Sequence, residues 1–511
     1  MRRPIRAALL AIDLGSSSVK TLLISAESGA PIAIARRPTG SGSDSVEQDP
    51  ERWWRAICAA TGEVLTAATV AGGEQLEVVA IGVDGHGPSL VPVRADGRAA
   101  GFALMWRDRR SADDEVALAA ALHRGGWLLG ELPKARWLIR ERRDVAAQSA
   151  WLLSSWDALT YRLTGVAVSS FWDPARRVSL AQRSALLGLG LDDRALPPEV
   201  APGTKIGSLL PGPASELGLP TGVPIAAGTN DGLAAVIGAG LTVPGIGVDV
   251  GGTAGGVAVS ATRAVAAHIA TAHPGLLWSG PTPTPFGDER ILGGAFAGTG
   301  RLLEWVVTDL LGRDPAAATD RRADLFRAAA ALPIGAHGLV AKPIPSSGFG
   351  SPHTAEEVFV GRASHHGPEH FVRAAIEGGA IAIANLLAPA RASGLPINEI
   401  RLSGPATGAA PGPLSGGEPV PAALVQLRAD LFELPVVIGQ NTEASAAGAA
   451  ALAGVAAGVF ADLREASEAV ATPVVRITPQ ANLRDEVHTL RERVRALAVE
   501  EGARGAGRRE D

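Results

Sequence analysis

One stretch decides the fold of this chain: Ala11-Ile12-Asp13-Leu14-Gly15-Ser16-Ser17-Ser18-Val19-Lys20-Thr21-Leu22-Leu23-Ile24. A short apolar segment ends near an acid, a turn of glycine and serines follows, and a second apolar segment returns. This pattern predicts a β-hairpin. It recurs, aligned without a gap, in Val248-Asp249-Val250-Gly251-Gly252-Thr253-Ala254-Gly255-Gly256-Val257-Ala258-Val259. The chain therefore contains an internal repeat of long period.

Two copies of a repeat do not make a solenoid, so we expect a duplicated α/β domain. We place the first domain at residues 1–241, the second at 242–480, and a charged helical or disordered tail at 481–511. Apolar runs predict strands at Val78–Val83, Leu90–Val93 and Ile400–Leu402. Helical periodicity predicts helices at Asp49–Ala68, Trp151–Leu163, Gly298–Leu311, His370–Leu387 and Pro421–Leu431.

Composition excludes several classes of protein. Of the 511 residues, 46% are hydrophobic and 19% are charged, which is typical of a globular chain and not of a disordered one. The net charge is −5 and no basic run is interleaved with aromatics, so we expect no nucleic-acid partner. The single cysteine, Cys58, excludes an intrachain disulfide and fits a cytoplasmic location.

One uncharged stretch, residues 444–461, approaches transmembrane length. Alanine and glycine dominate it, and Gly448, Gly454 and Gly458 interrupt it. These residues favour a packed core helix followed by a turn. We therefore expect no association with a membrane.

The turns of both hairpins are candidate phosphate sites. Small residues leave backbone N–H groups uncovered and let a phosphate approach closely, and hydroxyl side chains suit its oxygens. Two such turns in duplicated domains would grip one nucleotide from opposite sides. Asp13 and Asp249 would then lie near the phosphates, where a carboxylate commonly holds Mg²⁺ directly or through water. The alternative for each acid is a turn-capping side chain, and for Asp249 that alternative is at least as well supported.

A candidate catalytic acid lies in Pro224-Ile225-Ala226-Ala227-Gly228-Thr229-Asn230-Asp231-Gly232-Leu233-Ala234-Ala235. A buried strand ends in a glycine, and Asp231 sits just before a helix of small residues. This places a carboxylate at the carboxyl edge of a sheet, where ligand sites of α/β proteins usually lie. The alternative is a helix N-cap, which would be the default for an isolated Asn-Asp-Gly.

The Asp13 hairpin resembles the phosphate loop of the superfamily of actin-like ATPases and sugar kinases. Further motifs are similar to those of the FGGY carbohydrate kinases, in family order from about Ala8 to Asp462. They are the Trp106-Arg107-Asp108-Arg109-Arg110-Ser111 segment, Lys134 with Trp137-Leu138, the spacing within Val358–Glu377, and the Ile400–Gly404 strand. The resemblance implies two duplicated ribonuclease H-like domains of the actin-like ATPase type, with a cleft between them.

The resemblance also implies ATP-dependent phosphorylation of a sugar, with Asp231 as general base and Mg²⁺ near Asp13. It implies sugar contacts by His86, Trp106, Asp108 and Asp231. For ATP and its phosphates it implies contacts by Gly15, Ser16, Ser17, Gly252, Thr253, Gly300, Gly404 and Pro405. Relatives of this kind are commonly homodimers.

Departures from the family pattern leave the substrate and the activity open. We expect a ketopentose such as xylulose ahead of glycerol or gluconate. However, His86 replaces a glutamine common in xylulose kinases, and Arg107–Arg110 is closer to the glycerol kinase version of its segment. Pro405 interrupts a loop that is usually three glycines, and proline adds bulk and fixes φ. Two alternatives remain: a degenerate member that binds sugar without phosphorylating it, and an actin-like ATPase.

Overall fold

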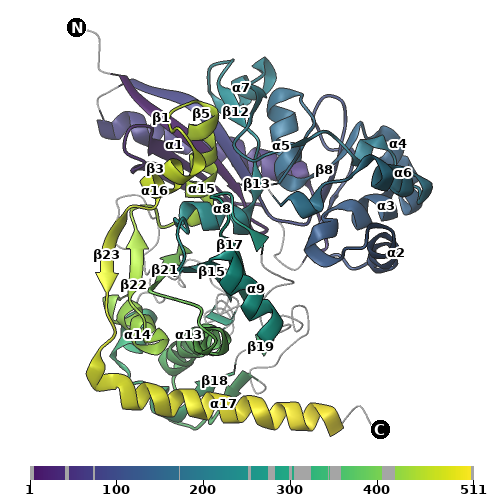
Figure 1. Cartoon of the computed structure of the whole chain (residues 1–511). Helices are drawn as coiled ribbons and strands as arrows, with labels where there is room; N and C mark the ends of the chain where they lie inside the picture. The colour runs from purple at the N-terminus through teal and green to yellow at the C-terminus, as the bar shows by residue number, and fades with distance from the viewer. Residues whose placement is uncertain are drawn as a thin grey trace. The chain divides into compact units, whose positions relative to one another are not determined.

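The computed structural model of the chain describes residues 5–40, 45–72, 75–171, 173–250, 255–273, 282–297, 302–303, 306, 324–342, 344–345, 358–404 and 421–507. The chain divides into two compact units (Figure 1). Unit 1 comprises Met1–Thr242, Pro283–Gly287 and Glu443–Thr472, and unit 2 comprises Val243–Thr282, Asp288–Thr442 and Pro473–Asp511. A segment of the C-terminal half thus belongs to the first unit.

Unit 1 is built on a seven-stranded sheet of order β11-β12-β5-β1-β2-β3, in which β13 also pairs with β5. Its central strand β1 is almost wholly buried from Ala8 to Leu14, which explains its continuous apolar sequence. β1 pairs antiparallel with β2 through the predicted hairpin and parallel with β5. The strands are β1 (Ile5–Leu14), β2 (Ser18–Ser25), β3 (Pro31–Pro38), β5 (Gln75–Gly85), β11 (Lys205–Ser208), β12 (Pro224–Ala226) and β13 (Thr229–Asn230).

Helices cover the faces of this sheet. α1 (Pro50–Gly72) packs on β2 and β3 and buries Trp53, Ile57, Ala60 and Val64, one helical face. α15 (Ala444–Ala456) packs on β1, β5 and α8 (Asp231–Gly238). Unit 1 also contains the helices α5 (Ser155–Thr164), α7 (Pro211–Leu217) and α16 (Leu463–Val470).

The alanine- and glycine-rich helix α15 makes unusually close contacts. A Cβ atom added at Gly448 would lie 1.9 Å from the carbonyl oxygen of Ala234, and one at Gly238 would lie 1.8 Å from that of Ala444. Only glycine lets these two backbones approach so closely. The prediction of a packed core helix in residues 444–461 is therefore confirmed, and the helix ends before Gly458, whose φ is 70°.

A smaller part of unit 1 has its own core around Leu90, Leu118, Leu138 and Leu152. It contains a four-stranded sheet of order β4-β7-β6-β8. Its elements are β4 (Glu47–Gln48), β6 (Leu90–Val93), β7 (Ala103–Leu104), α2 (Ala112–Leu122), α3 (Leu132–Glu141), α4 (Arg143–Gln148), β8 (Trp151–Ser154) and α6 (Leu180–Gly188), with β9 (Ser169–Ser170) and β10 (Glu199–Val200) paired beside them.

The predicted helix at Trp151–Leu163 is wrong in its first turn. Trp151–Ser154 forms strand β8, which pairs antiparallel with β6, and helix α5 begins only at Ser155. Ser154 is the reason, because its Oγ accepts a hydrogen bond from the backbone N–H of Asp157 and caps the helix there. Gly165, with φ of 72°, ends the helix.

Unit 2 repeats the arrangement in a sheet of order β16-β17-β15-β14-β21-β22-β23, with β19 paired to β17. β14 pairs antiparallel with β15 through the second predicted hairpin and parallel with β21. The strands are β14 (Ile246–Val250), β15 (Gly255–Ala261), β16 (Thr282–Pro283), β17 (Arg290–Ala297), β19 (Ile344–Pro345), β21 (Glu399–Ser403), β22 (Val436–Gly439) and β23 (Pro473–Ile477), with β18 (Val340–Ala341) and β20 (Phe359–Val360) forming a separate pair.

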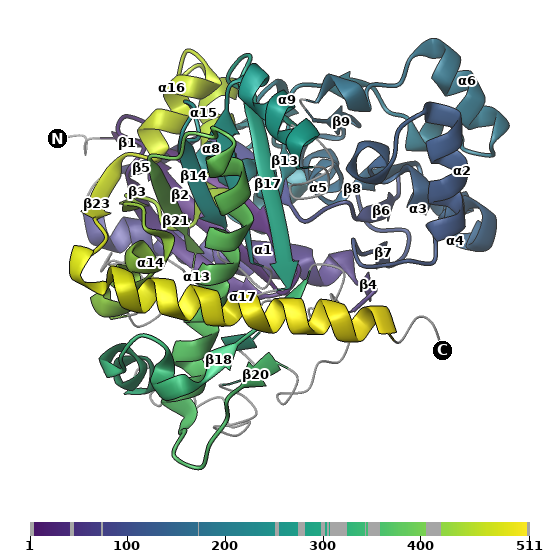
Figure 2. The ribbon, with the colours of Figure 1, turned by 60° about the horizontal axis from the view of Figure 1, so that its bottom comes forward.

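Four helices of unit 2 are α9 (Arg263–Ala272), α13 (Pro368–Ala392), α14 (Ala422–Phe432) and α17 (Arg484–Gly507). α17 runs beside α13 and α14 (Figure 2) and buries Val487, Leu490 and Val494 in the core of the unit. Among the described residues, α13 is the one helix long and apolar enough to cross a membrane, and 78% of its most apolar window is buried inside the protein. The predicted helix at Gly298–Leu311 lies almost entirely outside the described residues.

Candidate active site

Three acids gather at the carboxyl edge of the sheet in unit 1. Asp13 lies near the end of β1 and pairs in register with Asp84 of β5. Thr229 of β13 pairs with Asp84 on its other side, and Asp231 follows two residues later. Because β1, β5 and β13 are parallel neighbours, the topology brings all three carboxyl groups to one edge.

Asp231 is the first residue of α8, and its carboxylate is not the helix cap. The cap is Asn230, whose Oδ1 accepts from the backbone N–H of Leu233 at 3.0 Å. Oδ1 of Asp231 accepts from the backbone N–H of Gly232 at 2.7 Å and from Asn230 Nδ2 at 2.9 Å. Both hydrogen bonds from described residues thus go to one oxygen, which leaves Oδ2 as an acceptor.

The environment of Asp231 raises the pKa of its carboxyl group. Burial, and then the charge of Asp13, raise the pKa of Asp231 to about 7, while the hydrogen bond from Gly232 and the charge of Lys20 oppose the rise. A base whose pKa lies near neutrality combines an adequate ionised fraction with adequate basicity. The group is therefore suited to accept a proton.

Asp13 belongs to a chain of alternating charges. Lys20 Nζ contacts Asp13 Oδ2 at 3.0 Å and Glu443 Oε2 at 2.9 Å, and Arg36 Nη2 contacts Glu443 Oε1 at 3.0 Å. Burial disfavours the Lys20 ammonium, but the two carboxylates outweigh it and raise the pKa of Lys20 above its usual value. Lys20 therefore stays charged and fixes Asp13. Sequence reasoning missed both Lys20 and Glu443 as members of the site.

Asp84 is a third residue that sequence reasoning missed. It is fully buried, and no described residue donates a hydrogen bond to either of its oxygens. Burial and the charges of Asp13 and Asp231 raise its pKa well above the usual value, which favours a neutral carboxyl beside Asp13. The sequence feature that could have identified Asp84 is its place as an acid at the end of an apolar strand, directly before Gly85.

The turn after Asp13 is held from several sides. Gln48 Nε2 donates to the carbonyl oxygen of Ser16 at 2.9 Å, and the backbone N–H of Thr39 donates to that of Ser17 at 3.0 Å. Trp106 Nε1 donates to Ser16 Oγ at 3.1 Å. The structure thus brings the predicted sugar-side tryptophan and the predicted phosphate turn, Gly15–Ser17, into direct contact within unit 1.

His86 is buried beneath this edge. Its backbone N–H donates to the carbonyl oxygen of Leu14 at 3.0 Å, Nδ1 lies 2.9 Å from Ser89 Oγ, and the ring packs edge-on against Trp53. Burial lowers the pKa of His86 to about 4, so the ring is neutral, and its Nε2 has no partner among the described residues. A role in substrate binding stays a prediction.

Asp108 is held by Arg110. Arg110 Nε lies 3.0 Å from both carboxylate oxygens, and its Nη2 also contacts Glu47 at 2.7 Å. The guanidinium stacks 4.4 Å from the centre of the Trp137 ring. The Trp106–Arg110 segment is therefore rigidly placed, with Asp108 mostly buried.

Comparison with known proteins settles the family. The family description "FGGY family of carbohydrate kinases, N-terminal domain" matches residues 8–238, and the C-terminal domain of the same family matches residues 250–411 and 413–457. The chain belongs to the FGGY family of carbohydrate kinases. Such an enzyme is a phosphotransferase that uses ATP and acts on an alcohol group of a small sugar or polyol.

Individual FGGY kinases are similar over almost the whole chain. The xylulose kinase of Bacillus subtilis is 24% identical over 507 residues, which cover 94% of this chain and 95% of the relative. The glycerol kinase of Bordetella parapertussis is 28% identical over 498 residues, covering 89% and 90%. The crystal structure of xylulose kinase from Rhodospirillum rubrum superimposes with a TM-score of 0.68 at 25% identity, covering 96% of this chain and 98% of that one. The predicted two-domain actin-like α/β fold is confirmed.

The predicted nucleotide side of this FGGY kinase falls largely outside the described residues, which do not include Gly252, Thr253, Gly300 or Pro405. Gly404 follows β21 with a φ of 60°, and its backbone N–H donates to the carbonyl oxygen of Thr442 at 2.6 Å. Asp249 is buried in β14, where burial raises its pKa to about 6 and the charge of Arg428 opposes the rise. Nucleotide contacts in unit 2 stay predictions.

Proposed function

We propose that this FGGY kinase phosphorylates a ketopentose such as xylulose, with Asp231 as the general base. The xylulose kinases among its relatives support the ketopentose. The similarity to glycerol kinases makes glycerol the second candidate, because identity to the Bordetella parapertussis relative is no lower. Gluconate is a third.

The geometry of Asp231 carries the proposal. Phosphoryl transfer to a sugar needs an acceptor hydroxyl placed in line with the γ-phosphate and a group that takes its proton. Asp231 offers Oδ2, to which no described residue donates a hydrogen bond, and a pKa of about 7. Its backbone is anchored, since Ser445 Oγ donates to the Asp231 carbonyl oxygen at 3.1 Å.

The surrounding residues take the roles that the sequence predicts. Trp106, Asp108 and His86 would contact the sugar, within a sugar-side domain at residues 1–241. Gly15, Ser16 and Ser17 would meet the phosphates from that side. Residues 242–480 would supply Gly252, Thr253, Gly300, Gly404 and Pro405 for the nucleotide. The hydrogen bond between Trp106 and Ser16 supports a short distance between sugar and phosphate.

Mg²⁺ is proposed at Asp13, directly or through water. Carboxylate oxygens are ligands that Mg²⁺ prefers, and it commonly needs only one or two of them besides substrate phosphates and water. The buried oxygens of Asp84, to which no described residue donates a hydrogen bond, fit an additional hydrogen-bonding group for such water. Bound there, the ion would neutralise charge on the transferring phosphoryl group.

The test is ADP release by the purified chain with Mg·ATP and a panel of xylulose, glycerol and gluconate. We expect release only with an acceptor, and fastest with xylulose. Binding of a sugar without turnover across the panel would favour the degenerate family member instead. ADP release that needs no acceptor would favour an ATPase.

A further inference from the structure

Gln48 of β4 links helix α1 to the turn of the Asp13 hairpin. The residue is only 1% exposed. Trp53 Nε1 donates to Gln48 Oε1 at 2.8 Å, and Gln48 Nε2 donates to the carbonyl oxygen of Ser16 at 2.9 Å. Because an indole N–H can only donate a hydrogen bond, Trp53 fixes the oxygen end of the amide. The amide nitrogen of Gln48 therefore faces the turn.

The hydrogen bond from Gln48 sets the direction of the peptide group between Ser16 and Ser17. The Ser16 carbonyl points toward Gln48, in the interior of unit 1. In a planar trans peptide, the C=O and the following N–H point in opposite directions. The backbone N–H of Ser17, an exposed residue, therefore points away from Gln48, and it donates to no described residue.

The side chain of Ser16 is oriented in a similar way. Trp106 Nε1 donates to Ser16 Oγ at 3.1 Å. Because the indole can only donate, Ser16 Oγ is the acceptor and keeps its own proton for another partner. Ser16 is half-buried, and its hydroxyl donates to no described residue. Phosphate oxygens accept hydrogen bonds, so the Ser16 hydroxyl and the Ser17 N–H together suit a phosphate group.

Gln48 can influence a ligand only through this turn, because it is buried and both ends of its amide are bonded within the protein. Thr39 supports the same turn. Its N–H donates to the Ser17 carbonyl oxygen at 3.0 Å, and its Oγ1 donates to that of Ser16 at 3.3 Å. The bond from Gln48 is the shorter of the two that Ser16 accepts. Its loss should therefore leave the hairpin folded and let the Ser16–Ser17 peptide rotate.

We propose that Gln48 is a positioning residue for the phosphates of ATP. It holds the Ser16 carbonyl inward and so directs the Ser17 N–H outward, where, with the Ser16 hydroxyl that Trp106 orients, it donates to phosphate oxygens. The proposal rests on the phosphate contacts proposed above for Ser16 and Ser17. It does not depend on which sugar is the acceptor or on Asp231 as the base.

Gln48→Glu tests the proposal with almost no change of shape. An ionised carboxylate still accepts from Trp53 but cannot donate to the Ser16 carbonyl. The readout is binding of a non-hydrolysable ATP analogue with Mg²⁺ to the full chain, by calorimetry without any acceptor. At about pH 8 we expect binding at least about tenfold weaker than in the wild type, as for a lost hydrogen bond to a charged group.

The pH dependence of this variant separates positioning from a general loss of stability. Burial raises the pKa of a carboxyl group, and a protonated carboxyl donates as the amide of Gln48 does. Most of the loss relative to the wild type at the same pH should therefore disappear at about pH 5.5. Gln48→Met has a similar volume and no donor at any pH, so its loss should be the same at both values. Thermal melting checks that each variant is folded.

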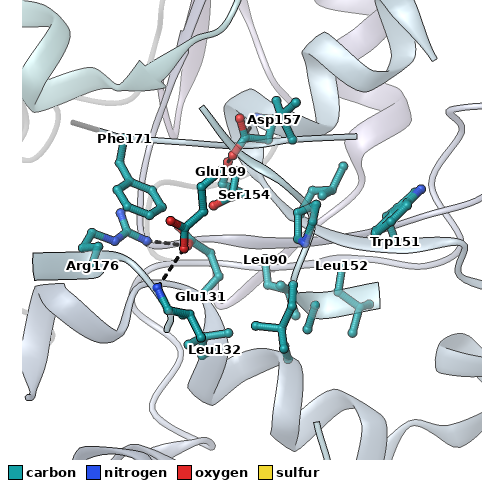
Figure 3. A pocket seen from close by; sticks show the side chains of 18 of the residues that line it. Leu90, Glu131, Leu132, Trp151, Leu152, Ser154, Asp157, Phe171, Arg176 and Glu199 are labelled. Carbon is teal, nitrogen blue, oxygen red and sulfur yellow. Dashed lines mark hydrogen bonds and ion pairs between the residues drawn. The ribbon is translucent and has the colours of Figure 1, made fainter. Parts of the chain in front are cut away.

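Glu131→Gln is the matched control, since it also exchanges a carboxylate and an amide at a buried contact of unit 1. Glu131 Oε2 lies 3.0 Å from Arg176 Nη2 in a mostly buried ion pair, at the wall of a cavity of about 490 Å³ (Figure 3). The residues that line this cavity do not include Gln48 or Ser16. This variant should lower Tm and leave binding of the analogue unchanged.

Two results would overturn the proposal. The first is wild-type affinity for the analogue in folded Gln48→Glu at about pH 8 or in folded Gln48→Met. The second is an equal loss in Glu131→Gln, because the effect would then come from the stability of unit 1. Turnover with a sugar is measured separately. Weak analogue binding that recovers at low pH, in a chain that phosphorylates no acceptor, would refute the proposed function alone.

Discussion

The Asp13 hairpin of unit 1 and the Asp249 hairpin of unit 2 have the same backbone arrangement. In each, the strand that carries the acid pairs antiparallel with the strand after the turn and parallel with a later strand, β5 or β21. Asp13 lies opposite Asp84 in this register, and Asp249 lies opposite Leu402. The two copies are equivalent as scaffolds.

Their side chains differ. Asp13 is paired with Lys20, which Glu443 holds in turn, whereas the position equivalent to Lys20 in the second hairpin is Gly256. Asp249 is buried near the single charge of Arg428. The strand pairing around the hairpin is thus the same in both units, whereas the residues proposed as the general base and the Mg²⁺ ligand, Asp231 and Asp13, both lie in unit 1.

The largest difference in kcat between the two hairpins is expected when each acid is neutralised in turn. Asp13→Asn should lower kcat at least about 10²-fold, because it removes the proposed Mg²⁺ ligand and the charge that helps raise the pKa of Asp231. Asp249→Asn should leave kcat within about threefold and lower Tm instead, since it leaves Arg428 buried without its counter-charge. Equal losses of kcat in both variants would refute the asymmetry.

Glu443→Gln should have an intermediate effect. The substitution weakens the ion pair between Glu443 and Lys20 and leaves Asp13 unchanged. We therefore expect a fall in kcat of about tenfold, equivalent to roughly 1.4 kcal/mol in the activation free energy. Arg36→Gln is the matched control, because the Arg36 side chain is 52% exposed and its ion pair is screened by solvent. If Arg36→Gln lowers kcat as much as Glu443→Gln does, the chain of charges supports catalysis through the stability of the fold and not through the position of Lys20.

The smallest effect on catalysis should come from the packing beneath the hairpin. Gly448→Ala places a methyl group against the Ala234 carbonyl oxygen and should destabilise unit 1 by about 1–3 kcal/mol, as overpacking does. Gly62→Ala in helix α1 meets nothing within 4 Å and should raise stability by about 0.5–1 kcal/mol. Urea denaturation measures the free energy of unfolding of both variants. A Gly448→Ala variant as stable as the wild type would contradict the close contact between Gly448 and the Ala234 carbonyl oxygen.

Local patterns sufficed to predict the hairpins, the position of Asp231 at a sheet edge and most long helices. They failed where a single side chain decides the secondary structure. Ser154 caps α5, so the helix begins at Ser155 and Trp151–Ser154 forms a strand instead. They also failed for contacts between distant parts of the chain. Arg36 and Glu443 are 407 residues apart, and no periodicity links them. Asp84 was missed because one acid in an apolar strand does not show which neighbours the sheet will give it.

The most direct test of the central claim is the pH dependence of kcat for the wild type and for Asp231→Asn. A base must be deprotonated to act, so with a pKa of about 7 wild-type kcat should level off above neutral pH and fall about tenfold per pH unit below it.

Asp231→Asn should lower kcat at least about 10²-fold, remove this pH dependence, and leave nucleotide binding nearly unchanged. Near-normal turnover of Asp231→Asn with the same pH profile would show that another group takes the proton, and would contradict the account.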